Sequence, residues 1–189
     1  MGRSPCEEIG LRSVVPWLLA GILAAAPGAA GAQHCIDFKW DVSRERALFA
    51  KPPAVLAAGR ESANAPALAL DRLYELRLVP QDRVAFAAPP GKSTYGENVY
   101  AGLASLAIAA PGLYRIAIDV PVWVDLATGN QLVRALDYQG QHDCDAPHKI
   151  LVYELNRPGR FVLQFSGEIA QRVHVTVIRL ESGADSAGR

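Results

Sequence analysis

The sequence predicts an all-β protein, an antiparallel β-sandwich of the Ig-like or jelly-roll kind with roughly nine or ten strands and one disulfide. Three observations support this prediction. Short runs of alternating apolar and polar residues recur at intervals of about ten residues, turn-forming residues separate them, and no long run has helical spacing. Short strands joined by tight turns pair antiparallel, because parallel neighbours need long crossovers. A closed barrel is the alternative architecture.

The region before the regular strands contains three predicted elements. Residues 36–40 (IDFKW) alternate and predict a first strand. Residues 41–50 predict one or two helical turns, with a candidate cap at Ser43. Residues 51–66 are rich in alanine, proline and glycine and therefore predict a long surface loop.

The remaining predicted strands follow one another along the chain, separated by turn signals. In the run from residue 70, Tyr74 and Leu76 fall on one face and Glu75 on the other, and Gly129-Asn130 marks a hairpin turn further along the chain. The predicted strands are residues 70–79, 83–87, 99–109, 113–120, 122–126, 131–138, 149–155, 160–166 and 172–180.

The first 32 residues have the organisation of a secretory signal peptide. A polar leader contains Arg3 and Arg12, residues 14–26 are apolar, and Ala30-Gly31-Ala32 is a small-residue cleavage site. A membrane anchor is the competing interpretation, but the apolar stretch is short and contains Pro16. We therefore expect a periplasmic or secreted protein without stable membrane insertion, one domain over residues 33–181, and a solvated tail over residues 182–189.

Cleavage at that site leaves two cysteines, Cys35 and Cys144. An even number of cysteines in an oxidising compartment predicts one disulfide. Closing a loop of about 100 residues contributes about 4 to 5 kcal/mol in the loop-entropy account. Two reduced thiols that bind a metal are the alternative.

Charge and motif content exclude several classes of function. Lys plus Arg and Asp plus Glu each number 19, so the chain lacks the basic field that nucleic acids or anionic membranes select. Gly91-Lys92-Ser93-Thr94 looks like the end of a phosphate-binding loop. However, Phe86 stands where that motif needs glycine, and Pro89 and Pro90 remove backbone donors. We therefore do not expect a nucleotide site.

A metal-binding hypothesis rests on the histidines. His142, Asp145 and His148 lie within seven residues, and the predicted disulfide would bring His34 beside them. Copper, zinc and iron all accept imidazole ligands. The simpler interpretation is a solvated polar loop, because the spacing matches no specific zinc pattern. The alternation places His174 on a solvent-facing side of its strand.

A ligand-stacking hypothesis rests on aromatic residues. Trp123 and Tyr138, with Tyr114, fall on predicted strands that neighbour one another. Rings exposed in a row stack on sugars or peptides, whereas buried rings form an ordinary sandwich core. The core interpretation is favoured, because large aromatic residues are mostly buried.

Residues 99–180 resemble the pre-peptidase C-terminal (PPC-like) domains of secreted bacterial proteins. The resemblance is carried by GLYRIAID at 112–119, WVD at 123–125, HKI at 148–150 and LQFSG at 163–167. The whole chain resembles small exported proteobacterial β-sandwich proteins of unestablished function. This likeness implies the fold and the compartment, and it carries over no catalytic residue.

The leading functional hypothesis is an exported, non-catalytic binding or envelope accessory module whose partner is a protein, a glycan or a small molecule. It follows from the leader, the strand pattern and the lack of a catalytic constellation in the sequence. The alternative is a periplasmic metalloprotein that uses the His142–His148 loop as a metal carrier or a small oxidative enzyme.

Overall fold

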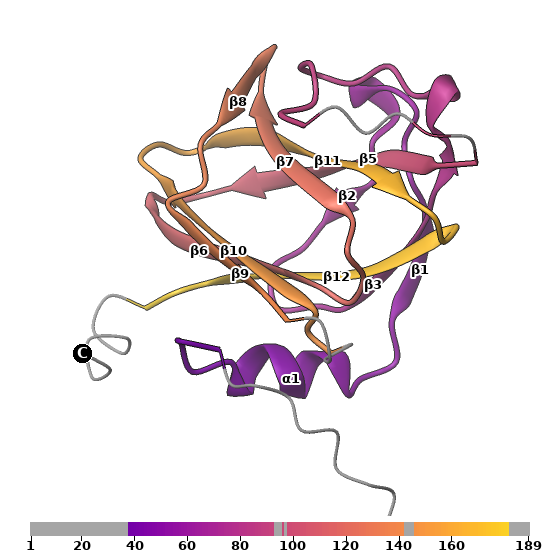
Figure 1. Ribbon diagram of the computed structural model, residues 1–189. Helices are drawn as coiled ribbons and strands as arrows, with labels where there is room; N and C mark the ends of the chain where they lie inside the picture. The colour runs from indigo at the N-terminus through magenta and orange to yellow at the C-terminus, as the bar shows by residue number, and fades with distance from the viewer. Residues whose placement is uncertain (1–37, 93–95, 97, 142–145, 182–189) are drawn as a thin grey trace, which may run out of the picture. The chain divides into compact units, whose positions relative to one another are not determined.

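The computed structural model describes residues 38–92, 96, 98–141 and 146–181, which form two β-sheets and one short helix (Figure 1). The predicted signal peptide (1–32) and tail (182–189) lie outside these residues. The described part contains twelve strands, more than the nine or ten predicted. They are β1 (Ala54–Ala57), β2 (Ala67–Leu68), β3 (Tyr74–Arg77), β4 (Val79–Pro80), β5 (Tyr100–Ile108), β6 (Gly112–Ile118), β7 (Trp123–Thr128), β8 (Gln131–Val133), β9 (Asp137–Gly140), β10 (Lys149–Leu155), β11 (Gly159–Glu168) and β12 (Arg172–Arg179).

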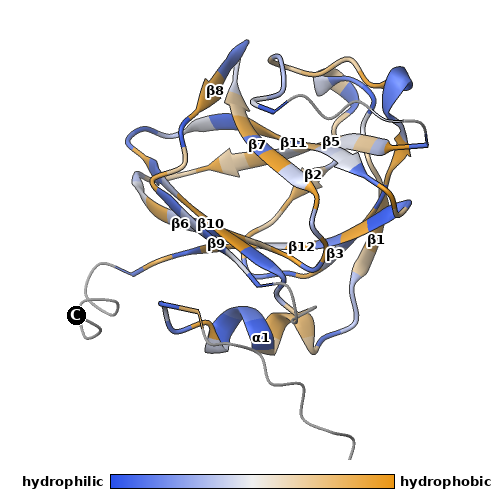
Figure 2. Cartoon of the chain, in the orientation of Figure 1, coloured by the Kyte–Doolittle hydropathy of each residue, from blue (hydrophilic) through white to orange (hydrophobic). Residues whose placement is uncertain are grey.

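The two sheets pack face to face as a β-sandwich. Sheet A has the strand order β1-β3-β12-β6-β10-β9, and sheet B has the order β2-β5-β11-β7-β8, with β4 also paired to β5. One core cluster joins inward-facing residues of both sheets, among them Ile116 and Val175 from sheet A and Leu163 and Leu126 from sheet B. Figure 2 shows apolar residues along the strands of both sheets. Burial of this shared apolar surface holds the layers together.

The sheets are mixed, whereas the sequence predicted antiparallel pairing throughout. β1 runs parallel to β3, and β2 runs parallel to β5. The segment predicted as a surface loop, residues 51–66, contains β1, and the chain visits sheet B at β2 before it returns to sheet A. This excursion gives the chain the length that a parallel return needs.

Two other predicted strands differ from the structure. Residues 83–87 form no strand, and they follow a 3₁₀ turn at Gln81–Arg83. Residues 131–138 are divided between β8 in sheet B and the start of β9 in sheet A. The described part of the predicted first strand, from Phe38 to Trp40, is irregular.

The predicted helical turns are confirmed as α1 (Ser43–Phe49), which covers part of the outer face of sheet A (Figure 1). Phe38 and Val42 bury their side chains against Ala117 and Ile150 of that sheet. The sequence predicted Ser43 as the N-cap, but the N-cap residue of the helix is Val42 and Ser43 is its first residue. Asp41 instead organises the start of the helix, since its carboxylate accepts a hydrogen bond from the Ser43 backbone N–H at 2.9 Å.

A buried ion pair connects α1 to the sheet. Glu45 is 0% exposed and Arg115 of β6 is 5% exposed, and the Arg115 Nε lies 2.9 Å from the Glu45 Oε1. Arg115 also donates from Nη1 to the Asp41 carbonyl at 2.9 Å. The Arg115 guanidinium therefore holds both the helix and the segment before it.

No helix among the described residues is long and apolar enough to span a bilayer.

Removal of the Glu45 carboxylate is predicted to destabilise the fold strongly. Glu45→Ala removes the carboxylate that lies against the buried Arg115 charge, and breaking a buried pair in this way costs about 3 to 5 kcal/mol. Urea unfolding measures the loss. Arg44→Ala is the matched control on the same helix: its pair with Asp71 is exposed, so a change of about 1 kcal/mol or less is expected. Equal losses in the two variants would contradict a buried, structurally essential pair.

Candidate functional site

The candidate site lies on the outer face of sheet B, where residues 81–92 cross the sheet. Gln164 of β11 points outward and is 1% exposed. Its side-chain amide donates to the Ala88 carbonyl at 3.1 Å and accepts from the Ala88 N–H at 2.9 Å. Both backbone polar groups of Ala88 are thereby satisfied in a buried position, which fixes the crossing segment.

Apolar and close polar contacts complete this attachment. Val84 and Phe86 pack on Leu103 and Val162, which face outward from sheet B. The Gly91 N–H donates to the Asp125 Oδ2 at 2.9 Å. A Cβ at position 91 would lie 2.9 Å from the other Asp125 carboxylate oxygen, so glycine permits this close approach. The same contacts bring the next residue, Lys92, over sheet B.

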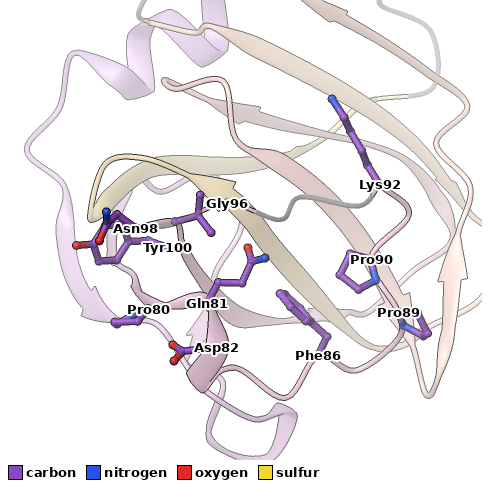
Figure 3. A pocket seen from close by; sticks show the side chains of 11 residues that line it. Pro80, Gln81, Asp82, Phe86, Pro89, Pro90, Lys92, Gly96, Asn98 and Tyr100 are labelled. Carbon is purple, nitrogen blue, oxygen red and sulfur yellow. The ribbon is translucent and has the colours of Figure 1, made fainter.

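A cleft of about 760 Å³ opens between the crossing segment and the chain leading into β5 (Figure 3). This volume is within the range of small-molecule and cofactor sites. Its wall is largely apolar, with two amides, one carboxylate and one ammonium. The lining residues are Pro80, Gln81, Asp82, Phe86, Pro89, Pro90, Lys92, Gly96, Asn98, Val99 and Tyr100.

Several contacts brace the lining residues. Gln81 accepts a hydrogen bond from the Gly167 N–H at 2.7 Å, and the Tyr100 hydroxyl accepts one from Gln171 at 2.8 Å. In Figure 3, Lys92 and the two prolines Pro89 and Pro90 lie at the opposite end of the cleft from Tyr100. The cleft therefore has a cationic end beside rigid proline walls.

Trp123 lies beneath this cationic end. The Lys92 Nζ is 5.7 Å from the centroid of the Trp123 ring, and the Lys149 Nζ is 6.0 Å from it. Lys149 comes from β10 in the other sheet and donates to the Val122 carbonyl at 2.8 Å. Burial, followed by repulsion from Lys92, lowers the pKa of Lys149 below its ordinary value.

The stacking residues predicted from the sequence are not arranged in a row. Trp123 is partly buried in sheet B, whereas Tyr138 is 69% exposed on the edge strand β9 of sheet A. Tyr114 belongs to the core, where it is 2% exposed. Trp123 belongs to sheet B, whereas Tyr114 and Tyr138 belong to sheet A. Of the three aromatic residues, only Trp123 therefore lies near the cleft.

The predicted metal and disulfide residues fall mostly outside the described part of the chain: His34, Cys35, His142, Cys144 and Asp145. The metal site and the disulfide stay predictions. His148 is described and buried, and its backbone N–H donates to the Ile118 carbonyl at 2.7 Å. Within the described residues, no three His, Cys, Asp or Glu side chains are grouped so that they could hold a metal ion.

His174 has acidic neighbours on the outer face of sheet A. Its Nδ1 is 2.6 Å from the Asp119 Oδ2, and its Nε2 is 3.5 Å from the Glu75 Oε2. The Asp119 carboxylate also accepts from the His174 N–H at 2.7 Å. These contacts connect the strands β3 and β12 to the chain after β6, and the imidazole is only partly exposed.

Sequence reasoning missed the cleft itself. It singled out Lys92 as part of a false nucleotide motif, and it assigned residues 83–87 to a strand. The available signal was the pair of prolines in the segment, Pro89 and Pro90. A segment with that composition crosses a sheet more readily than it joins one.

Comparison of the chain with protein-family models gave no match, and a search of curated proteins found no similar sequence.

Substitution of Gln164 is predicted to release the crossing segment. Gln164→Leu keeps the side chain large but leaves the Ala88 N–H and carbonyl without partners, at a cost of about 1 to 3 kcal/mol for a buried polar group. Hydrogen exchange at the Ala88 amide should accelerate together with that of neighbouring amides. Gln171→Leu, at an exposed position, is the control and should leave Ala88 protected. Unchanged protection in Gln164→Leu would contradict this attachment.

Lys149 is predicted to make stability depend on pH. Its pKa in the folded state lies below the ordinary 10.5, so the unfolded chain binds the proton more tightly. Stability relative to a variant without this lysine should therefore rise as the pH increases from the folded-state pKa towards 10.5. Urea unfolding of the wild type and Lys149→Met measures this difference. Lys51→Met, at an exposed site, controls for the loss of one lysine. If the difference in unfolding free energy between the wild type and Lys149→Met stayed constant with pH, the proposed cost of burying the Lys149 charge would be contradicted.

Proposed function

We propose that this protein is an exported, non-catalytic binding module of the β-sandwich class, which takes its ligand into the cleft on the outer face of sheet B. The cleft itself carries the proposal. It combines mostly apolar walls with a few polar groups at fixed positions, the combination that orients a bound ligand.

The cleft walls suit recognition because they are held rigidly. Gln164 fixes one wall through Ala88, and Gln171 holds Tyr100 on the other side. A wall that is already ordered loses little conformational entropy when a ligand binds. The prolines restrict the backbone further.

The polar groups in the cleft suit binding more than catalysis. The described lining provides the amides of Gln81 and Asn98, the Asp82 carboxylate and the Lys92 ammonium. These groups donate and accept hydrogen bonds to a glycan, a peptide or a small molecule. Export to the periplasm or the medium rests on the predicted leader, and the envelope accessory role belongs to the same proposal.

A binding screen with a cleft variant tests the proposed function. The purified chain is applied to arrays of glycans and peptides and to a small-molecule thermal-shift library, and the affinities of the ligands found are then measured. Phe86→Ala removes one of the two aromatic side chains in the lining and should weaken binding about tenfold or more, a loss of about 1.4 kcal/mol.

The matched control is Leu136→Ala, which removes an apolar side chain that is exposed beside β9. It should bind as the wild type does, and both variants should show cooperative unfolding. Binding that is equally strong in Phe86→Ala would place the ligand elsewhere. The absence of any ligand for the wild type would overturn the proposal.

A further inference from the structure

Two lysines lie near one aromatic ring, and one of them forms the cationic end of the cleft. Lys92 is exposed and lines the cleft, and Lys149 reaches the same Trp123 ring from sheet A. Neither lysine forms an ion pair with a described residue. Two ammonium groups so placed repel each other, which favours an anion that would neutralise both.

The nearby carboxylates Asp125 and Glu168 form no ion pair with either lysine within the described residues. The Asp125 Oδ2 accepts the Gly91 N–H, and the Glu168 Oε1 accepts the N–H groups of Ile169 and Ala170, each at 2.9 Å. Repulsion from Lys92 affects Lys149 more than attraction by Glu168 does. Glu168 therefore offsets only part of the repulsion that Lys149 experiences from Lys92.

Trp123 and the neighbouring Ser166 each carry a buried polar group that has no hydrogen-bond partner among the described residues. These groups are the Trp123 Nε1 and the Ser166 Oγ. Ser166 is 1% exposed and is directly opposite Trp123 in the pairing of β11 with β7, so both side chains stand on the outer face of sheet B. Buried donors of this kind normally have a partner.

We propose that Lys92 and Lys149, assisted by Trp123 Nε1 and Ser166 Oγ, bind a tetrahedral oxyanion, so that the ligand of the cleft carries a phosphate or sulfate group. A tetrahedral group presents its oxygens in several directions, which suits donors that come from different strands and loops, whereas the two oxygens of a carboxylate lie in one plane. This inference rests on the proposed function and names the chemical class of its ligand.

The indole N–H resonance of Trp123 tests the site directly. The purified, ¹⁵N-labelled chain is titrated with inorganic phosphate, sulfate or acetate at constant ionic strength. Trp40 is an internal control, because Lys39 lies 4.6 Å from the centroid of its ring. That lysine is already paired with Asp137 at 2.6 Å. Phosphate and sulfate should shift the Trp123 indole resonance until the site is saturated, and they should leave the Trp40 indole resonance unchanged.

Three lysine variants make the test specific. Lys92→Met and Lys149→Met should each weaken phosphate binding about tenfold or more, while Lys39→Met should leave it unchanged. Lys92 is exposed, so its variant tests the site even where Lys149→Met unfolds. Equal shifts at Trp40, or no saturable shift at Trp123, would overturn the site. Acetate as effective as phosphate would overturn the tetrahedral assignment.

The outcome is distinguishable from failure of the proposed function. If ligands from the arrays bind and Phe86→Ala loses them while phosphate leaves Trp123 unchanged, the oxyanion site fails and the binding module stands. If phosphate shifts Trp123 but Phe86→Ala binds array ligands normally, the cleft proposal fails and the anion site stands alone.

Discussion

The candidate site depends on one pair of hydrogen bonds, between the Gln164 side chain and the backbone of Ala88. A buried amide on a central strand needs partners for both its donor and its acceptor, and a single residue of the crossing segment provides them. This contact holds residues 81–92 against sheet B. It thereby creates one wall of the cleft and brings Lys92 over Trp123. Without it, the outward apolar residues Leu103 and Val162 would lose the segment that covers them.

Both sheets are covered on their outer faces, but by different means. On sheet A, the buried pair of Glu45 and Arg115 fixes a short helix. On sheet B, neutral amide bonds fix an irregular segment. The central strands are therefore buried on two faces, which explains why β5 is buried without interruption from Ala101 to Leu106. A helix packs closely against a sheet, whereas an irregular, proline-rich segment leaves space beside it. The cleft lies on the side that has the irregular cover.

Alternation in the sequence predicted the long strands well because each has at least one face in the common core. The strands β5, β6, β7, β10, β11 and β12 match predicted runs to within a few residues. The strand prediction failed where the chain passes from one sheet to the other. Residues 131–138 were predicted as one strand, yet they belong to two sheets, since a local pattern describes the faces of a strand and carries no information about its neighbours. The parallel pairs of β1 and β2 were missed for the same reason.

The sequence by itself determined the all-β class, most strand positions, the short helix and Trp123 as a candidate ligand-stacking residue. Only the tertiary structure decided what surrounds Trp123. Lys149 and Trp123 are far apart in the sequence and belong to different sheets. Their proximity therefore arises from the packing of the two sheets. The cleft likewise needs Gln164 and Ala88 to meet across a long stretch of chain. Local patterns fix which way a side chain points, whereas a binding site requires contacts between segments that only the complete fold brings together.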